Sequence, residues 1–244
     1  MSRLTLDNAE NLAIKMRTQL QLSLTEPVNA KTVVRVLGIL TLYRPLSETL
    51  YGLSVKSADS RFRFILVNSN STRGRQHFTN AHELYHQYYD SNPHSHFCKA
   101  GNQDESERAA NLFARAFLMP KAGIMKSISD EELTTGKISL TTVLNLEALY
   151  GVSHMAMLIR LKELKLISPA MFESYQSIRV IKEAELRGLD VSLYKNGNEG
   201  VVIGDFGAKA RELFDKDIIS EGHYWELLNK IGYGCGESEN SAGC

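Results

Sequence analysis

The sequence has no excess of charge of either sign, since its 244 residues include 28 Lys and Arg and 28 Asp and Glu. It therefore lacks the overall basic field that drives binding to nucleic-acid phosphates. It also lacks an apolar run long enough to cross a bilayer, and residues 1–11 are polar, unlike a secretory signal. These absences favour a cytoplasmic protein with no membrane partner.

Cysteine is also scarce. Cys98, Cys235 and Cys244 have no zinc-ribbon spacing, and the last two lie in a tail rich in Gly and Ser. The sequence thus excludes a disulfide framework and a zinc ribbon, and we expect three reduced thiols without a role. Apolar residues, in contrast, make up 43% of the chain, which is enough for a substantial core.

The most informative feature that is present is the run H-E-L-Y-H at residues 82–86, within a stretch typical of a helix. Positions i and i+4 lie on one face of a helix, so His82 and His86 can reach a single metal ion, with Glu83 beside them as a candidate base. The alternating segment 61–67 predicts a strand just before it, and Ser71 or Thr72 is a candidate helix cap. Strand, turn and H-E-x-x-H helix therefore follow one another.

A third ligand is expected from the next helix, over residues 104–118. Glu107 shares one face of that helix with Asn111, Ala114 and Leu118, so its carboxylate can point inward. The alternative role for Glu107 is that of a first-turn acid that complements the helix dipole. Asp104 and Glu105 lie close enough in sequence to remain alternative ligands, but Glu107 is favoured because it alone belongs to the inward face.

Two histidines and one carboxylate would form a catalytic Zn²⁺ site with one position left for water. Zinc lowers the pKa of such a water, and Glu83 could accept its proton and pass it to the departing amine. A metzincin would need Gly and His where this chain has Tyr89 and Asn92, so that class is excluded. His94, His96 and Cys98 form a second candidate cluster, which we interpret as a solvated loop.

The runs RQHFTNAHELYH (75–86) and ERAANLFARAFLMP (107–120) together resemble the ImmA/IrrE family of metallo-endopeptidases. The resemblance covers roughly residues 30–165. By matching position it implies that His82, His86 and Glu107 are the zinc ligands and that Glu83 is the catalytic base. It also implies a protein substrate, often a helix-turn-helix repressor, whose cleavage relieves repression in mobile elements or stress responses.

The chain departs from the family pattern at two positions. Tyr85 stands where the family commonly has Gly, and Ala109 stands where it often has a second acid. These departures concern the shape of the cleft and the groups around the ligands.

Residues 138–166 predict two helices joined by a tight turn at residues 151–153, with Ser153 as the cap of the second. The pattern is that of a helix-turn-helix, and DNA binding is one hypothesis. The other, which we favour, is a helical hairpin that packs on the catalytic domain or contacts the substrate, because basic residues are few (Arg160, Lys162 and Lys165).

The fold class we predict is α+β, with a small antiparallel sheet packed on the zinc-peptidase helices and a mainly helical C-terminal region. Helices are expected over 7–22, after Pro27 up to Gly38, 74–89, 104–118 and 171–187, and as a pair over 205–231 capped at Ser220. Strands are expected near 39–43, 51–56 and 61–67, and a hairpin over 191–203.

We divide the chain into a zincin-like metallopeptidase domain (1–125), a helix-turn-helix-like region (126–168) and a C-terminal α/β module with a flexible tail (169–244). The last part suggests no chemistry beyond substrate recognition or dimerisation. His154 and His223 are candidates to polarise the substrate carbonyl, although packed or surface histidines are more common. Overall, the sequence predicts a zinc endopeptidase, and the alternative is a DNA- or protein-binding regulator with a degenerate peptidase site.

Overall fold

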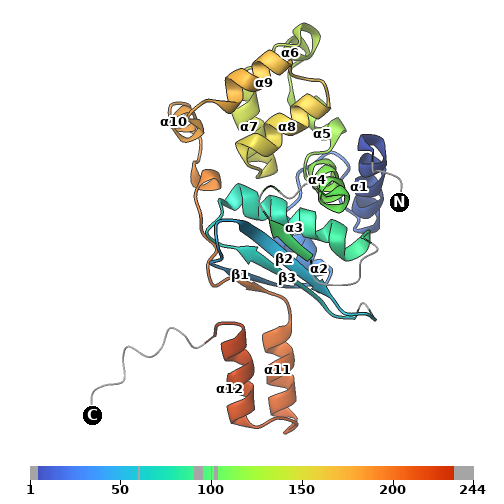
Figure 1. Ribbon diagram of the computed structural model, residues 1–244, viewed down its shortest axis with the longest axis vertical. Coiled ribbons are helices and arrows are strands. Elements are labelled where there is room, and N and C mark those ends of the chain that lie inside the picture. The colour runs from blue at the N-terminus through green and yellow to red at the C-terminus, as the bar shows by residue number, and fades with distance from the viewer. Residues whose placement is uncertain (1–4, 60, 91–95, 100, 102–103, 234–244) are drawn as a thin grey trace, which may run out of the picture.

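The computed structural model describes residues 5–59, 61–90, 96–99, 101 and 104–233. Helices surround one small sheet (Figure 1), which confirms the predicted α+β class. The elements are, in chain order, α1 (Leu6–Gln19), α2 (Ala30–Val36), β1 (Leu40–Arg44), β2 (Leu50–Lys56), β3 (Arg63–Asn68), α3 (Arg73–Tyr88), β4 (His96–Lys99), α4 (Glu105–Leu118), α5 (Lys121–Ser127), α6 (Asp130–Thr135), α7 (Leu140–Tyr150), α8 (His154–Glu163), α9 (Pro169–Gln176), α10 (Val180–Glu185), the 3₁₀ turn η1 (Ser192–Tyr194), β5 (Val202–Ile203), α11 (Phe206–Asp215) and α12 (Glu221–Lys230).

The sheet has the strand order β4-β2-β3-β1-β5 and is mixed. β1 and β3 are parallel, while the other neighbouring strands are antiparallel. The prediction of a wholly antiparallel sheet was therefore wrong in this detail. The loop after β1 leads to β2, which does not pair with β1. Instead β3 lies between them, antiparallel to β2 and therefore parallel to β1. The Asn68 amide at the end of β3 holds that loop, donating to the backbone oxygens of Ser47 and Leu50.

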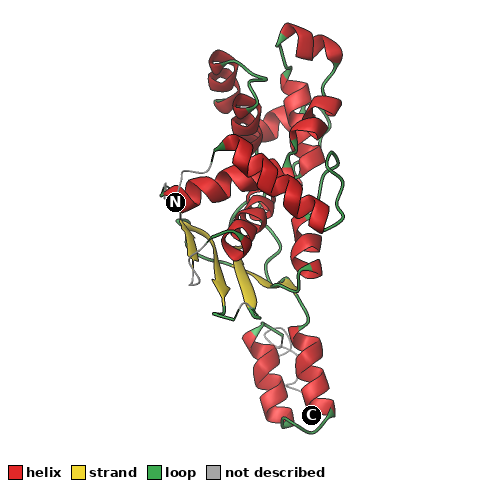
Figure 2. Ribbon diagram, turned by 90° about the vertical axis from the view of Figure 1, so that its right-hand side faces the viewer, coloured by secondary structure: helices red, strands yellow, loops and turns green. Residues whose placement is uncertain are grey.

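Both faces of the sheet are apolar, but each packs against a different set of helices. On β3, Ile65 and Val67 are fully buried in the main core with the helices. Phe64 and Leu66 point to the opposite face. They pack in a smaller cluster with Leu228 of α12 and with Ile231, which follows that helix. The α11–α12 pair therefore lies on the opposite side of the sheet from α3, as two perpendicular views show (Figure 1 and Figure 2).

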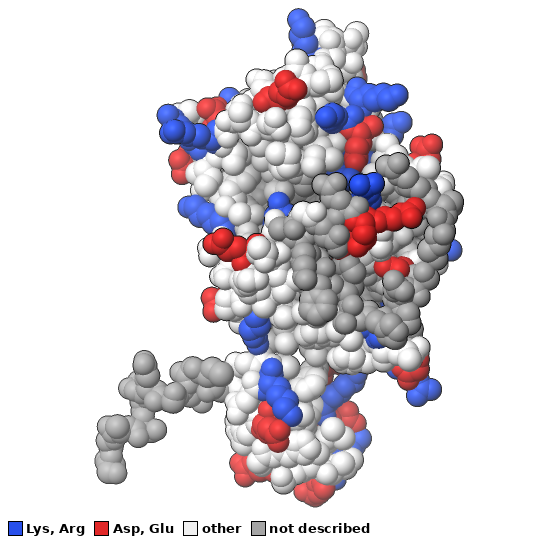
Figure 3. All heavy atoms as spheres, in the orientation of Figure 1, with Lys and Arg blue, Asp and Glu red and all other residues white. Residues whose placement is uncertain are grey.

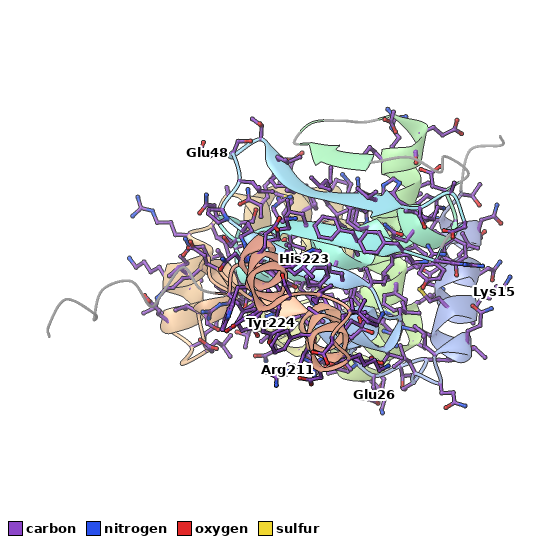
Figure 4. The ribbon with its side chains drawn as sticks, turned by 90° about the horizontal axis from the view of Figure 1, so that it is seen from below. Lys15, Glu26, Glu48, Arg211, His223 and Tyr224 are labelled. Atoms are coloured by element: carbon purple, nitrogen blue, oxygen red, sulfur yellow. The ribbon has the colours of Figure 1, made fainter. Side chains whose placement is uncertain are left out.

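The α11–α12 pair, which the sequence predicted together with the Ser220 cap, has ring contacts between its two helices. The Phe214 and Tyr224 rings stack with centroids 5.2 Å apart, and Arg211 lies over both rings. Seen from below, Arg211 and Tyr224 project from the two neighbouring helices, and His223 lies on the same pair (Figure 4). His223 is exposed there, with the main body of the sheet behind it.

The α7–α8 pair is the predicted helix-turn-helix-like region. The turn between its two helices packs against α3. A Cβ atom added at Gly74, in the first turn of α3, would lie 2.8 Å from the Ser153 nitrogen. His77, also on α3, has its Nδ1 atom 2.9 Å from the Gly151 carbonyl oxygen and accepts a hydrogen bond from the Ala30 nitrogen through Nε2. The turn is therefore part of the packing around α3.

None of the described helices is by itself both long and apolar enough to cross a bilayer. The α7–α8 pair reaches that length only when its two helices are counted together across their 109° bend.

Two predictions for the C-terminal third were wrong. The helix expected over 171–187 is divided into α9 and α10, and the expected hairpin over 191–203 is absent from this described part of the chain, where β5 instead pairs with β1. Residues 195–197 bind to the first turn of α3. The Arg73 backbone nitrogen donates to the Lys195 carbonyl oxygen, and the Gln76 side chain donates to the Gly197 carbonyl oxygen. These contacts compete with a local hairpin.

A buried network joins α7, α8, α9 and η1. The Glu147 carboxylate lies 2.6 Å from His154 Nδ1 and accepts a 2.8 Å hydrogen bond from the Tyr194 hydroxyl. His154 Nε2 lies 2.9 Å from the Tyr175 carbonyl oxygen. Both ring nitrogens thus face acceptors, which requires a doubly protonated imidazolium. Burial lowers the pKa of His154, but the hydrogen bond and charge of Glu147 outweigh burial and raise that pKa above its ordinary value.

We predict that this network stabilises the fold most strongly in mild acid. A folded-state pKa raised above that of the unfolded chain gives stability that is complete below about pH 6.5 and is lost as the pH rises through the folded-state value. His154→Gln should therefore lower the free energy of unfolding by about 1.5–3 kcal/mol at pH 6 and by less at pH 9. Urea unfolding followed by circular dichroism measures both, with exposed His223→Gln as the control. A loss that is the same at all pH values would contradict a charged His154.

Candidate metal centre

The helix α3 positions the two candidate histidine ligands. It begins after Thr72, whose side chain accepts a hydrogen bond from the Arg75 nitrogen, so the predicted cap is present. His82 and His86 are one turn apart on its buried face, with only 1% and 4% of their surface exposed. Their Nε2 atoms lie 3.2 Å apart. The helix therefore brings two imidazole nitrogens to one point inside the protein.

The helix α4 brings Glu107 to the same point. Asp104 caps this helix by accepting the Glu107 backbone hydrogen bond at 2.9 Å, and Glu105 is exposed. Glu107 is 2% exposed, with one carboxylate oxygen 3.4 Å from His82 Nε2 and the other 3.9 Å from His86 Nε2. Glu107 is thus the neighbouring acid whose carboxylate lies against both His82 and His86.

The outer nitrogen of each imidazole faces an acceptor. His82 Nδ1 lies 3.2 Å from the Asn111 side-chain oxygen, and His86 Nδ1 lies 2.9 Å from an Asp90 carboxylate oxygen. The Ser106 hydroxyl donates to the same Asp90 oxygen at 2.5 Å. Each Nδ1 atom must therefore carry a proton that it can donate. This leaves the lone pair of each Nε2 atom directed at Glu107. Metal-binding histidines are usually oriented in this way.

The donor set fits a metal ion such as zinc. Bonds of 2.0–2.2 Å in a tetrahedral arrangement place ligand atoms roughly 3.3 Å apart, close to the separations between the two imidazoles and Glu107. Two nitrogen lone pairs and a carboxylate repel one another when they converge in a buried pocket, and a cation in their midst relieves that repulsion. His82, His86 and Glu107 can thus hold one metal ion, and Glu83 is the remaining acid beside them.

Cys98 also lies at this centre, which the sequence pattern did not indicate. It was assigned to a solvated loop, but it is a free thiol, 7% exposed, on β4 at the edge of the sheet. Cys98, His82 and Glu107 form a group in which the candidate ligand atoms all lie within 4.8 Å of one another. Of the other members of the predicted loop cluster, His94 lies outside the described residues, as does the side chain of His96.

The electrostatics of the pocket favour a cation. Burial lowers the pKa of His82, but Cys98, Glu107 and Glu83 outweigh burial and raise that pKa well above its ordinary value. Burial also raises the pKa of the Cys98 thiol. The surroundings of His82 therefore favour a positive charge at its Nε2 atom, which a bound metal ion would supply in place of a proton.

Tyr85, the unusual residue within the H-E-x-x-H run, packs in an aromatic cluster between α3 and α4. Its ring lies edge-on to His86 at a centroid distance of 5.7 Å and 5.9 Å from the Phe113 ring. Tyr89 completes the cluster, at 6.0 Å from Tyr85. Ala109 is buried in the core. Tyr85 thus supports the orientation of His86, and an acid in place of Ala109 would have little access to water.

An open cleft of about 520 Å³ lies beside the site. Its walls come from β2, α3, β4, α4 and α8, and they include Tyr51, Arg75, Phe78, His82, Cys98, Glu107, Arg108, Asn111 and Arg115. Arg75 lies over the Tyr51 ring, and Arg115 is paired with Glu163. The cleft is large enough to receive a segment of another polypeptide.

His154 and His223, the candidates for polarising a substrate carbonyl, are not part of this centre. His154 belongs to the Glu147 network, and His223 is exposed on α12 across the sheet. Among the described residues, neither is a wall of the cleft.

Comparison with known proteins gives one family. The model of the IrrE N-terminal-like domain, Peptidase_M78, matches residues 34–162, which is more than half of the chain. The matched segment runs from α2 to α8 and includes His82, Glu83, His86, Cys98 and Glu107. No curated protein matches the chain.

Gly52 allows β2 to lie close to α3. A Cβ atom at this position would be 2.7 Å from Thr79 Cγ2, 2.9 Å from the Leu66 carbonyl oxygen and 3.7 Å from Glu83 Oε1. We predict that Gly52→Ala lowers the free energy of unfolding by about 1–3 kcal/mol, because backbone must move to admit the methyl group. Urea unfolding measures the change. Gly222→Ala, whose nearest neighbour would be 4.0 Å away, is the control and should change stability little. Equal effects of both substitutions would contradict the close approach.

Proposed function

The chain belongs to the Peptidase_M78 family, and from that premise we propose that it is a zinc-dependent endopeptidase that cleaves a regulatory protein. The observation that carries the proposal is the convergence of His82 Nε2, His86 Nε2 and the Glu107 carboxylate within 3.2–3.9 Å, in a buried pocket that opens on a cleft. This is the two-histidine, one-carboxylate set found in catalytic zinc sites.

In this proposal His82, His86 and Glu107 hold the metal, while Asn111 and Asp90 orient the imidazoles. When bound, zinc would supply Lewis acidity that polarises the substrate carbonyl and lowers the pKa of water. Glu83 is the catalytic residue: its carboxylate takes the proton of the attacking water and returns it to the departing amine. The aromatic cluster around Tyr85 keeps His86 in place.

The substrate we propose is a repressor of the helix-turn-helix type, whose cleavage would relieve repression. The resemblance of the two motifs to ImmA/IrrE peptidases supports this proposal, as does a cleft wide enough for a peptide segment. We expect the protein to act in the cytoplasm, where its cysteines would stay reduced.

The α7–α8 pair offers little support for the alternative of DNA binding. Arg160 is fully buried, 2.6 Å from Glu10, and Lys162 lies over the Phe172 ring. A recognition helix presents its basic and polar side chains to the groove, whereas most of α8 is buried. Positive and negative side chains are also interspersed on the face seen in Figure 3.

We predict about one zinc per purified chain by elemental analysis, with zinc lost in His82→Ala, because that variant lacks one ligand. Glu83→Gln should retain zinc and the wild-type circular dichroism spectrum, yet lose cleavage of the repressor encoded nearest to its gene. Exposed Glu105→Gln is the matched control and should cleave like the wild type. Cleavage by Glu83→Gln would contradict the assigned role, and absence of zinc from the wild type would contradict the function.

We also predict that Asp90→Asn weakens zinc binding by roughly 10- to 100-fold, because the imidazole of His86 loses a charged acceptor. Competition with a chromophoric chelator measures the dissociation constant. Asp59→Asn, at an exposed surface pair with Arg61, is the control. An unchanged dissociation constant in Asp90→Asn would mean that His86 does not bind the metal in the orientation described.

A further inference from the structure

We propose that Cys98 is a fourth, displaceable ligand of the metal at this centre, and that its thiolate keeps the peptidase closed until the thiol is oxidised. This proposal rests on the proposed function, since it concerns the same metal. The proposal assigns a role to Cys98, a chemically reactive side chain at the centre that zinc peptidase chemistry does not need.

The sheet holds Cys98 against the centre. Cys98 pairs with Gly52 across β4 and β2, beside an irregularity in the register between Leu50 and Gly52. At Gly52, β2 lies close to Thr79 and Glu83 on α3, since an added Cβ atom would be 2.7 Å from Thr79 Cγ2 and 3.7 Å from Glu83 Oε1. A residue paired with Gly52 is thereby placed at the level of the H-E-x-x-H run, and the Cys98 sulfur lies within 4.8 Å of a His82 ring nitrogen.

The candidate ligands form two groups of three residues that have His82 and Glu107 in common. In the first group, the His82 and His86 Nε2 atoms lie 3.2 Å apart, one Glu107 oxygen lies 3.4 Å from His82 Nε2, and the other lies 3.9 Å from His86 Nε2. His82, Cys98 and Glu107 make the other, with all ligand atoms within 4.8 Å. His86 and Cys98 thus both lie beside the His82 and Glu107 ligand atoms, and zinc prefers four ligands in a tetrahedral arrangement. The thiolate is a strong zinc ligand and would take the fourth corner.

Four protein ligands would close the site. Catalytic zinc keeps one position for water, whereas sites with four protein ligands are structural. The cleft is consistent with a closed state: Cys98 lines it, while Glu83 is fully buried and is not among the described residues of its walls. A base without access to water in the cleft cannot activate it.

Oxidation by a hydroperoxide would open the site. The thiolate sulfur attacks one peroxide oxygen, a sulfur–oxygen bond forms as the oxygen–oxygen bond breaks, and the leaving oxygen takes a proton from solvent. The sulfur is oxidised to a sulfenic acid and the peroxide is reduced. The product is no longer a thiolate, so the fourth position is freed for water, and a thiol reductant restores the closed state.

Cobalt(II) replaces zinc in the test because a thiolate bound to cobalt gives a near-ultraviolet charge-transfer band. The protein carries Cys235→Ser and Cys244→Ser, so that Cys98 is its only thiol. We expect the band to saturate at about one cobalt per chain. A further Cys98→Ser substitution should abolish the band while cobalt still binds.

The outcomes separate the two proposals. Cobalt that binds without a thiolate band overturns the role of Cys98 and leaves the peptidase proposal standing. If no cobalt or zinc binds, the peptidase proposal fails as well. If Cys98→Ser does not fold, alkylation of the unsubstituted Cys98 by iodoacetamide is measured with and without zinc, and equal rates overturn the proposal.

The closed state is tested by repressor cleavage under reducing conditions. Cys98→Ser should cleave faster than the parent protein, and a hydroperoxide should activate the parent but not Cys98→Ser. Equal cleavage rates before and after peroxide treatment, in a parent protein that shows the thiolate band, would overturn the closing role.

Discussion

The contact between α3 and α4 buries four groups that prefer water: two imidazoles and the carboxylates of Glu83 and Glu107. Each is at most 4% exposed. Removing such groups from water costs several kcal/mol apiece unless hydrogen bonds, opposite charges or a metal ion compensate. Asn111 and Asp90 satisfy the outer nitrogens of the imidazoles, but the inner nitrogens converge on a carboxylate. A cation at that point is the simplest way to make the burial favourable, and the rest of the structure keeps these groups in place.

The supports come from three directions. Below α3, the sheet approaches closely because Gly52 has no side chain. Between α3 and α4, the rings of Tyr85, Tyr89 and Phe113 fill the space behind His86. Above the amino end of α3, the α7–α8 turn packs on Gly74 and His77, so a region with the sequence pattern of a DNA-binding motif serves as packing. Packing contacts from distant parts of the chain thus fix the positions of the side chains at the centre.

Local patterns were enough to predict the helices that hold His82, His86 and Glu107, because helical spacing sets which side chains share a face. The same reasoning placed Asn111 on the inward face of α4. Features fixed by contacts between distant segments could not be predicted. The parallel pairing of β1 with β3 depends on a loop tied to Asn68, and the burial of Cys98 depends on pairing between β4 and β2. The segment 191–203 was mistaken for a hairpin because its turn residues bind α3 instead.

The central claim is that a single metal ion is held where α3 and α4 meet. It is tested most directly by anomalous X-ray diffraction at the zinc absorption edge, from crystals of the full chain grown with zinc. The account predicts one strong anomalous peak within bonding distance of His82 Nε2, His86 Nε2 and a Glu107 carboxylate oxygen. A crystal with no peak at this point, or with its zinc bound elsewhere while these three side chains pack without it, would contradict the account.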